Sequence, residues 1–280
     1  MTALRSDAVT APEWLRVAAA TFIRDARTAS SYRVGFLLSF GGSVFGILGL
    51  YFLSKAVGPG ASTPIGPYGG DYFAFAVVGV AVSTFMGVGL TGIGSRIREG
   101  QMMGTLELML LSPNRLGILL FSASLWGHFQ AIVTLATYVL AAAILGMRLD
   151  DANLPMAALS LVIAAVAFNA LGLIAASVII VIKQGNPVSL IVGTASVLLG
   201  GVLYPPSVLP PVLQTIGQFL PLTQALELMR RSLLNGEGIA TLWGPLLMLV
   251  ALTAIYLPIG LWMCARAIRL ARTDGSLSQY

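Results

Sequence analysis

Charged side chains are scarce in this sequence. Of its 280 residues only 10% are charged, while 57% are hydrophobic; an ordinary soluble domain carries roughly 25% charged residues. So few charges cannot cover a water-exposed surface. Several charge-free runs reach the length of about 20 apolar residues that a helix needs to cross a bilayer, whereas membrane strands would alternate over about 10 residues. The sequence therefore predicts an all-α integral membrane protein.

Cysteine is nearly absent as well, because Cys264 is the single one. One cysteine allows neither a disulfide framework nor a cysteine-based metal site within the chain, and we expect no metal. The first 33 residues carry five arginines and no apolar run, so we expect no cleavable signal peptide. Elsewhere the basic residues flank apolar runs instead of clustering with aromatic residues, which indicates membrane topology rather than nucleic acid binding.

Two further features are absent, and their absence limits which energy sources the chain could use for transport. No Asp, Glu, Lys or Arg lies near the midpoint of a charge-free run, and proton- or sodium-coupled carriers usually bury such groups for the coupling ion. A phosphate-binding loop needs Gly-x-x-x-x-Gly-Lys followed by Ser or Thr. Here Ala56 follows Lys55 and Gln184 follows Lys183, the only other lysine. We therefore predict that the chain binds no nucleotide and is not an enzyme.

What the sequence does contain is a series of long apolar runs. They predict six spans, at about 34–54, 72–94, 117–146, 156–182, 187–204 and 241–265. An even number of spans places both termini on one side, where the segments hold 12 Lys and Arg against 4 on the other side. The excess predicts that both termini are cytosolic. The expected segments are a cytosolic N-terminal segment at 1–33, a transmembrane domain at 34–265 and a cytosolic tail at 266–280.

The N-terminal segment has the pattern of an amphipathic helix. Thr10-Ala-Pro-Glu13 resembles a capping box, in which both side chains satisfy amides that a helix start leaves unpaired. At 100° per residue, Trp14 and Phe22 fall on one side, while arginines gather on the other. We expect this helix to lie along the inner membrane surface, with a simple topology anchor as the alternative.

Prolines cluster after the fifth expected span, in an uncharged stretch of 43 residues at 184–226. A proline lacks an amide donor and clashes with the preceding turn, so no continuous helix is expected there. We predict a hairpin of two short helices at 205–235 that re-enters the outer half of the membrane, the second running from near Thr223 to Asn235-Gly236. An ordinary external loop is the alternative. The residues assigned to the hairpin are Pro205, Pro206, Leu209, Pro210, Pro221, Glu227 and Arg230; Glu227 can pair with either Arg230 or Arg231 on a helix.

The connection at 95–116, expected in the cytosol, has a methionine-rich apolar pattern. Apolar residues recur at helical spacing from Met102 to Leu110, and Ser112-Pro113 is typical of a helix boundary. Such a face suits a pocket on a partner that repacks between states. A short helix that floats in the membrane interface is the alternative.

Two polar residues, His128 and Asn169, lie inside expected spans. Ionisable groups within a membrane are costly and mark candidate transport paths, so both residues are candidates for contact with a transported molecule. Each could instead hydrogen-bond a neighbouring helix, and that alternative stays open.

An ordered series of motifs runs along nearly the whole chain, and it includes Glu99, Gly104-Thr105-Leu106-Glu107, Leu110 and Ser112-Pro113. The series resembles that of type-2 ABC exporter permeases. The resemblance implies that the 95–116 connection forms a coupling helix docked into an ATPase subunit. The coupling residues would be Glu99, Gly104, Thr105, Leu106, Glu107, Leu110, Ser112 and Pro113. Further matches are Lys183-Gln-Gly-Asn-Pro187, Gly200-Gly201-Val-Leu-Tyr-Pro205, Val208-Leu-Pro210 and Leu220-Pro-Leu-Thr223.

The resemblance also implies the partners and the location. Two cytosolic ABC ATPase subunits would bind the ATP and Mg beneath a pair of permeases, the second being an identical copy or a paralogue, in the inner (cell) membrane of a bacterium or archaeon. Membrane lipids are expected partners and nucleic acid is not. The charge-poor spans favour an amphiphilic, lipid-linked or drug-like cargo, and the family also exports polysaccharides. An ATP-independent secondary carrier or channel is the alternative. A membrane-embedded enzyme would need a cluster of acids or histidines, and Asp150-Asp151 is the only acidic pair.

Overall fold

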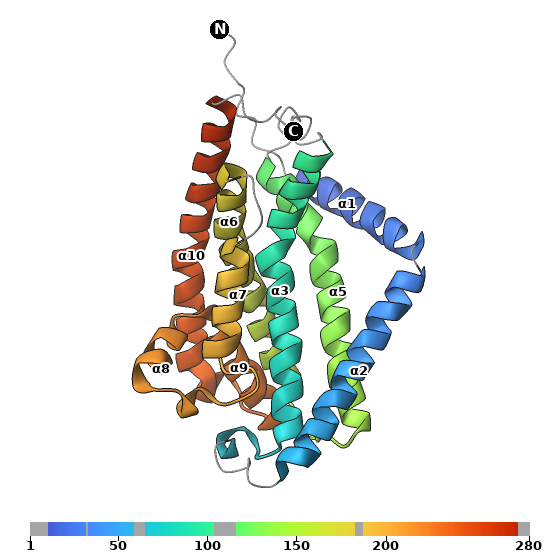
Figure 1. The fold of residues 1–280 in the computed structure, drawn as a ribbon, viewed down its shortest axis with the longest axis vertical. Helices are drawn as coiled ribbons and strands as arrows, with labels where there is room; N and C mark the ends of the chain where they lie inside the picture. The colour runs from blue at the N-terminus through green and yellow to red at the C-terminus, as the bar shows by residue number, and fades with distance from the viewer. Residues whose placement is uncertain (1–10, 32, 59–64, 104–115, 183–186, 274–280) are drawn as a thin grey trace.

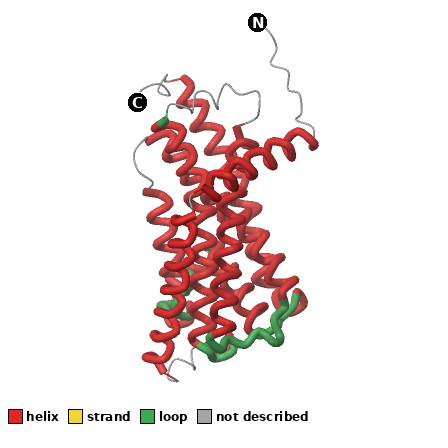
Figure 2. The backbone as a smooth tube through the Cα atoms, turned by 90° about the vertical axis from the view of Figure 1, so that its right-hand side faces the viewer, coloured by secondary structure: helices red, strands yellow, loops and turns green. Residues whose placement is uncertain are grey.

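The fold is a bundle of long helices that run side by side (Figures 1 and 2). The computed structural model describes residues 11–31, 33–58, 65–103, 116–182 and 187–273, and these residues form helices and loops without a strand. The long helices are α1 (Ala11–Ser31), α2 (Arg33–Val57), α3 (Tyr72–Met102), α5 (Leu116–Ile144), α6 (Leu154–Ile182) and α10 (Ile239–Thr273). Helix α7 (Pro187–Leu199) is shorter. Short helical elements are η2 (Gly66–Tyr68), η3 (Pro206–Val208), α8 (Pro211–Gln218) and α9 (Pro221–Leu234).

Length and composition identify the helices that suit a membrane. In the described ranges four helical stretches are long and apolar enough to cross one: Tyr72–Gly100, Ser124–Ile144, Leu154–Ile182 and Ile239–Leu270. Large apolar side chains such as Phe45 and Ile144 are exposed on the outside of the bundle, where water would disfavour them. The chain is therefore a multi-pass membrane protein.

The six predicted spans each coincide with a helix, but two of these helices are short in apolar length. The apolar parts are Gly41–Val57 in α2 and Pro187–Leu199 in α7. At 1.5 Å per residue the 13 residues of α7 extend about 20 Å, less than the roughly 30 Å of a bilayer core. The prediction that this helix runs to residue 204 is wrong. The helix ends before Gly201, because the backbone there has φ +74, which is outside the right-handed helical range. A Cβ added at this position would lie 2.6 Å from the Tyr204 carbonyl oxygen, so the turn requires glycine.

Helix α6 is the centre of the bundle, packed against α10, α3, α9 and α7. Small residues let its neighbours approach closely. A Cβ added to Gly172 would lie 2.2 Å from the Gly89 carbonyl oxygen on α3, and one added to Gly260 on α10 would lie 2.8 Å from the Ala170 carbonyl oxygen. These glycines set the spacing of α3, α6 and α10, and hence the shape of any space between them.

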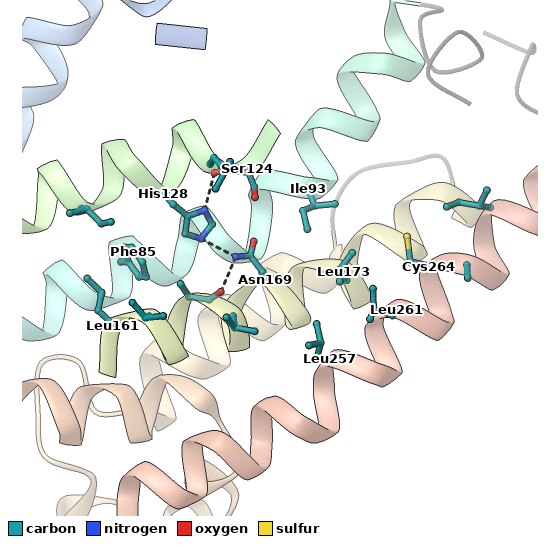
Figure 3. A pocket seen from close by; sticks show the side chains of 17 residues that line it. Phe85, Ile93, Ser124, His128, Leu161, Asn169, Leu173, Leu257, Leu261 and Cys264 are labelled. Carbon is teal, nitrogen blue, oxygen red and sulfur yellow. Dashed lines mark hydrogen bonds between the residues drawn. The ribbon is translucent and has the colours of Figure 1, made fainter. Parts of the chain in front are cut away.

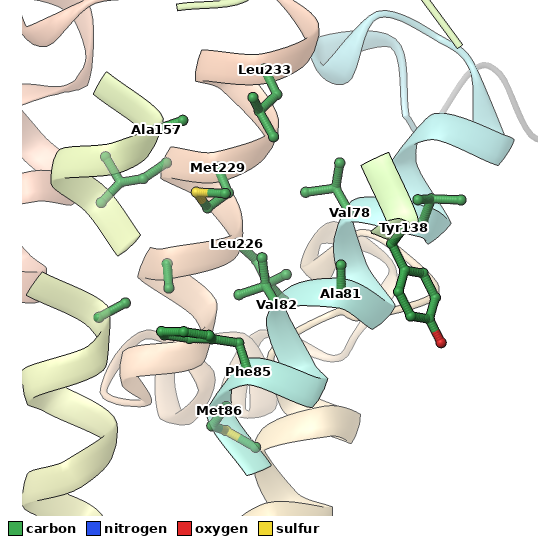
Figure 4. Packing of buried hydrophobic residues seen from close by; sticks show 14 of the residues in the cluster. Val78, Ala81, Val82, Phe85, Met86, Tyr138, Ala157, Leu226, Met229 and Leu233 are labelled. Carbon is green, nitrogen blue, oxygen red and sulfur yellow. The ribbon is translucent and has the colours of Figure 1, made fainter. Parts of the chain in front are cut away.

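The largest apolar core joins α3 to α9 and α6. Val78, Val82 and Phe85 of α3 pack with Leu226 and Met229 of α9, as Figure 4 shows, in a cluster that extends to α6. The short helix α9 is thus anchored in the core of the molecule, although it spans only 14 residues.

Helix α3 is longer than predicted. No helix end lies at residue 95, where the connection was expected to begin, because the helix continues to Met102. Ile97 on this extension is buried in a second apolar cluster with Ile180 of α6 and Ala267 of α10. Packing of that face holds the extra turns in the helix.

Helix α1 crosses the bundle at an angle near one end, before α2 begins (Figure 1). It starts at Ala11, directly after the predicted cap residue Thr10, which lies outside the described residues. Its Phe22 ring meets Trp126 and Phe129 of α5 edge to face, at centroid distances of 5.3 and 5.5 Å. Asp25 also pairs with Arg96 of α3, with 2.8 Å between Oδ2 and Nη2. Aromatic packing and a charge pair therefore attach α1 to two long helices.

Two short helices, α8 and α9, occupy the segment predicted to form the hairpin and lie at the end of the bundle opposite α1 (Figure 1). Helix α9 begins at Pro221, two residues before the predicted start, because proline fits the first helical turn, whose amide needs no partner. It ends at Leu234, and Gly236 follows with φ +70, which agrees with the predicted stop.

Candidate functional site: a polar pair in an apolar cavity

The two polar candidates within the long helices meet in space. His128 lies on α5 and Asn169 on α6, 41 residues apart, with 3.1 Å between His128 Nε2 and Asn169 Nδ2 (Figure 3). The sequence marked each residue separately and could not show that they pair, because the pairing depends on how α5 and α6 face each other across α3.

The hydrogen bonds around this pair define the protonation of the imidazole. His128 Nδ1 lies 2.9 Å from the Ser124 carbonyl oxygen, which can only accept, so Nδ1 carries the hydrogen. Nε2 therefore accepts from Asn169 Nδ2. The same amide nitrogen also donates to the Ala165 carbonyl oxygen at 2.8 Å. His128 is thus neutral, and both Asn169 amide hydrogens are used.

One acceptor of the pair is left over. Asn169 Oδ1 is buried and has no hydrogen-bond partner. Buried polar atoms in proteins are almost always paired, and an unpaired one is destabilising by about 1–3 kcal/mol. Asn169 Oδ1 is therefore a buried acceptor that could take a hydrogen bond from a donor.

A cavity of about 520 Å³ lies beside the pair, between α3, α5, α6 and α10. Its lining is apolar except for Ser124, His128 and Asn169, and no charged side chain contributes to it. Figure 3 shows Phe85 next to His128, with Leu257, Leu261 and Cys264 lining it from α10. The volume falls in the range of about 300–1,000 Å³ that holds small-molecule ligands. The cavity suits an apolar ligand with one hydrogen-bonding group.

The described residues offer little for covalent chemistry. They contain no group of three or more His, Cys, Asp or Glu side chains placed to hold a metal ion. The single histidine is engaged on both ring nitrogens. The apolar lining with its three polar side chains is suited to binding a small molecule.

A second polar cluster lies at the hairpin, around Arg230. This side chain is 1% exposed, and its guanidinium donates to the carbonyl oxygens of Phe75 at 3.2 Å, Gly201 at 2.9 Å and Val202 at 2.7 Å. It also lies 3.4 Å from the centroid of the Phe75 ring, close enough for a cation–π interaction. Arg230 therefore joins α9 to α3 and to the turn after α7.

Glu227 pairs with Arg231 rather than Arg230, at 3.3 Å between Oε1 and Nη1. Its other oxygen accepts a 2.6 Å hydrogen bond from the Tyr68 hydroxyl. Burial, and then the negative charge of Glu227, raise the pKa of Tyr68 above its ordinary value. Arg231 also binds Glu237, and that hydrogen bond lowers the pKa of the Glu237 carboxyl. These contacts tie the loop before α3 and the loop before α10 to α9.

The remaining predicted hairpin residues shape the backbone. Pro205 and Pro206 begin η3, Pro210 precedes α8, and Pro221 opens α9. The Leu209 carbonyl oxygen accepts a hydrogen bond from Gln214. None of the seven predicted hairpin residues lines the cavity beside His128, so the hairpin and the cavity are separate sites.

Sequence reasoning missed Tyr68, Ser124 and Gly79. A Cβ on Gly79 would lie 2.0 Å from the Val202 carbonyl oxygen and 2.6 Å from Arg230 Nη2, so only glycine leaves room for the buried guanidinium. Gly79 carried a weak signal as a glycine within an apolar run. Tyr68 and Ser124 carried none, because their roles come from contacts between distant segments.

The predicted coupling residues fall almost entirely outside the described residues. Gly104, Thr105, Leu106, Glu107, Leu110, Ser112 and Pro113 are in this group. Glu99 is described and lies exposed near the end of α3, with its Oε2 3.7 Å from Arg96 Nη1. Arg96 also holds Asp25 of α1, which is only 7% exposed. The α1–α3 ion pair thus lies about two helical turns before the end of α3 at Met102.

A family model matches most of the chain. The model of a family described as ABC-2 family transporter protein matches residues 61–262, well over half of the chain. No curated protein matches the sequence. The match includes α3, α5, α6, most of α10 and the whole 205–235 segment.

Proposed function

This chain belongs to the ABC-2 family of transporter proteins, and on that premise we propose that it is the permease subunit of an ATP-driven exporter of an amphiphilic cargo. Membership makes the chain a membrane subunit of an ABC transporter, a class that works with ABC ATPase partners. We further propose two ATPase subunits, a second permease copy or paralogue, and six spans with both termini in the cytosol of a bacterium or archaeon. ATP and Mg would be bound by the ATPases.

The proposed class of cargo is supported by the lining of the cavity beside His128 and Asn169. It is apolar, has three polar side chains and contains no charge. A charged group that leaves water without a partner charge is strongly disfavoured. This lining supports a lipid-linked or drug-like molecule over a charged soluble one or a polysaccharide.

We propose that the connection after α3 couples ATP hydrolysis to movement. Two features support the proposal: exposed Met102 and Met103 open the apolar pattern, and the ion pair of Asp25 with Arg96 attaches α1 to the helix that leads into it. A push on the connection would reach both α3 and α1. Glu107 and the Met/Leu face would contact the ATPase.

The test replaces Leu106 and Leu110 together with Asp, which places carboxylates in a contact that must be apolar. The expected result is loss of co-purification with the ATPase subunit and of cargo-stimulated ATP hydrolysis in liposomes, because an unpaired desolvated charge costs several kcal/mol. Leu106→Ile with Leu110→Ile is the matched control, which should retain both. If the double Asp variant keeps both activities at wild-type level, the coupling assignment fails.

A transport assay in the same liposomes distinguishes an exporter from an ATP-independent carrier or channel. The exporter requires added ATPase subunit and ATP for cargo movement. Movement by the purified chain alone, at a rate that ATP leaves unchanged, would favour the carrier or channel.

A further inference from the structure

We propose that the cavity beside His128 and Asn169 binds one uncharged, lipid-like molecule, which enters from the hydrocarbon core of the bilayer and donates a hydrogen bond to Asn169 Oδ1. The identification of this ligand as cargo rests on the proposed exporter function. Binding itself needs no ATPase, so it can be tested on this chain alone.

The need for a donor follows from the hydrogen bonds of the polar pair. Both amide hydrogens of Asn169 are used, one toward His128 Nε2 and one toward the Ala165 carbonyl oxygen. Oδ1 has no partner, so the group that complements it is a hydroxyl, an amide or another neutral donor. This buried oxygen belongs to a carboxamide that lines the cavity.

The absence of charge in the lining excludes an ionised group at this position. His128 is neutral in the observed hydrogen-bond network, and the lining includes no Asp, Glu, Lys or Arg. An ammonium or carboxylate would lose its hydration with no opposite charge to replace it. The buried part of the ligand is therefore neutral.

The route of entry follows from which lining residues are exposed. Ile132 of α5, Val162 of α6 and Leu261 of α10 all line the cavity and are exposed on the outside of the bundle, at 46%, 64% and 53%. Their exposed faces belong to stretches identified as membrane-spanning by length and composition. At the inner end, Phe85 is 1% exposed and its ring meets His128 edge to face at 5.6 Å. The opening thus faces the acyl chains, and the aromatic wall closes the other side.

The hydrogen-bonding requirement of His128 and Asn169 distinguishes a specific binding site from a groove that any acyl chain could fill. An apolar chain alone would satisfy the aliphatic walls and leave Oδ1 unpaired. A long-chain alcohol satisfies both. Binding that depends on the hydroxyl is therefore the property that a passive lipid groove lacks.

The experiment uses the full chain in phosphatidylcholine nanodiscs and a long-chain primary alcohol that carries a diazirine near its hydroxyl. Illumination should cross-link the probe to α5 and α6 close to His128 and Asn169, as located by mass spectrometry of the peptides. Unlabelled alcohol should compete about tenfold better than the alkane of equal length, and the ionised fatty acid should compete no better than the alkane. A tenfold ratio corresponds to about 1.4 kcal/mol.

Two variants and one control sharpen this result. Asn169→Leu keeps the size of the side chain and removes the acceptor, so labelling by the alcohol should fall about tenfold. Val166→Trp fills the cavity and should abolish labelling. Leu140→Trp adds the same ring to α5 at an exposed residue outside the cavity lining, and labelling should stay at the wild-type level. Thermal unfolding of each variant shows whether it is folded.

Three results would overturn the site: equal competition by alkane and alcohol, labelling confined to other helices, or wild-type labelling of Asn169→Leu. The competition series uses the wild-type chain, so it decides even if a variant does not fold. Failure of the proposed function is distinguishable, because it would appear as lost ATP-dependent transport with alcohol binding intact. Failure of the site alone would appear as intact ATP-dependent transport without hydroxyl-dependent binding.

Discussion

The two polar clusters of this bundle differ in how completely their hydrogen bonds are satisfied. At the hairpin, the guanidinium of Arg230 donates to three backbone carbonyl oxygens and lies against an aromatic ring. In the middle of the bundle, the Asn169 carboxamide leaves a buried oxygen without a partner. A fully paired cluster fits its own structure, whereas a partly paired one is suited to a ligand. The first therefore holds the fold together, and the second is the candidate for binding.

The largest effect is expected from Arg230→Ala. The substitution leaves the buried carbonyl oxygens of Gly201 and Val202 without a donor, at about 1–3 kcal/mol each when no water enters, so stability should fall by at least about 2 kcal/mol. Unfolding in detergent by increasing denaturant measures it. Arg231→Ala is the matched control on the neighbouring residue, which is partly exposed and pairs with Glu227 and Glu237; it should cost about 1 kcal/mol or less. Equal losses for the two arginines would break the comparison.

The next effect concerns the room left for that guanidinium. Gly79→Ala places a methyl group 2.0 Å from the Val202 carbonyl oxygen and 2.6 Å from Arg230 Nη2, and such overpacking costs typically about 1–3 kcal/mol. Gly92→Ala on the same helix meets no atom within 4 Å and should be neutral or slightly stabilising, since alanine is the better helix former. The same unfolding assay compares them. A harmless Gly79→Ala would mean that α3 and the turn after α7 are not closely packed.

A smaller effect is expected at the cavity. Asn169→Leu removes the bond to His128 Nε2 and also the unpaired oxygen, so the two changes offset and stability should shift by less than about 1 kcal/mol. The contrast with Arg230→Ala is the point of the measurement. A loss as large as that of Arg230→Ala would show that the polar pair is structural, like the hairpin cluster.

The smallest effect depends on pH, through Glu237 beside the hairpin. Its pKa is held below the ordinary 4.5, first by the hydrogen bond with Arg231. A carboxyl whose pKa is lowered in the folded state stabilises the protein at pH values above its unfolded-state pKa. This contribution is lost as the pH falls through the folded-state pKa. The pair is partly exposed, so at most about 1 kcal/mol is expected. Glu237→Gln should reduce stability at neutral pH and reduce its dependence on pH below 4.5; an unchanged pH dependence would contradict this role.

Most of the long helices could be predicted because their signals are local. The apolar runs at 72–94 and 156–182 are visible in the sequence, and their helices lie where expected. The proline-rich segment predicted two short helices for the same reason, since a proline acts on its own turn. The end of α3 could not be placed, because residues 95–102 stay helical through the contact of Ile97 with α6 and α10.

The candidate site was predicted only as separate residues. His128 and Asn169 are polar within apolar runs, which marks them from sequence alone. Their pairing, the unpaired oxygen and the cavity depend on the crossing of α3, α5, α6 and α10, which no local pattern encodes. The choice of Glu227 between Arg230 and Arg231 is a similar case, because the guanidinium of Arg230 is held by carbonyl oxygens from two distant segments.

The sequence by itself determined that this chain is a helical membrane protein, where its long helices lie, and which family it belongs to. These properties follow from runs of apolar residues and from ordered motifs, both of which act over short stretches of chain. Only the tertiary structure decided that one buried arginine fastens the hairpin while one asparagine faces a neutral cavity. The physical reason is that pairing of a buried polar atom depends on which backbone carbonyls neighbouring helices bring within about 3 Å of it.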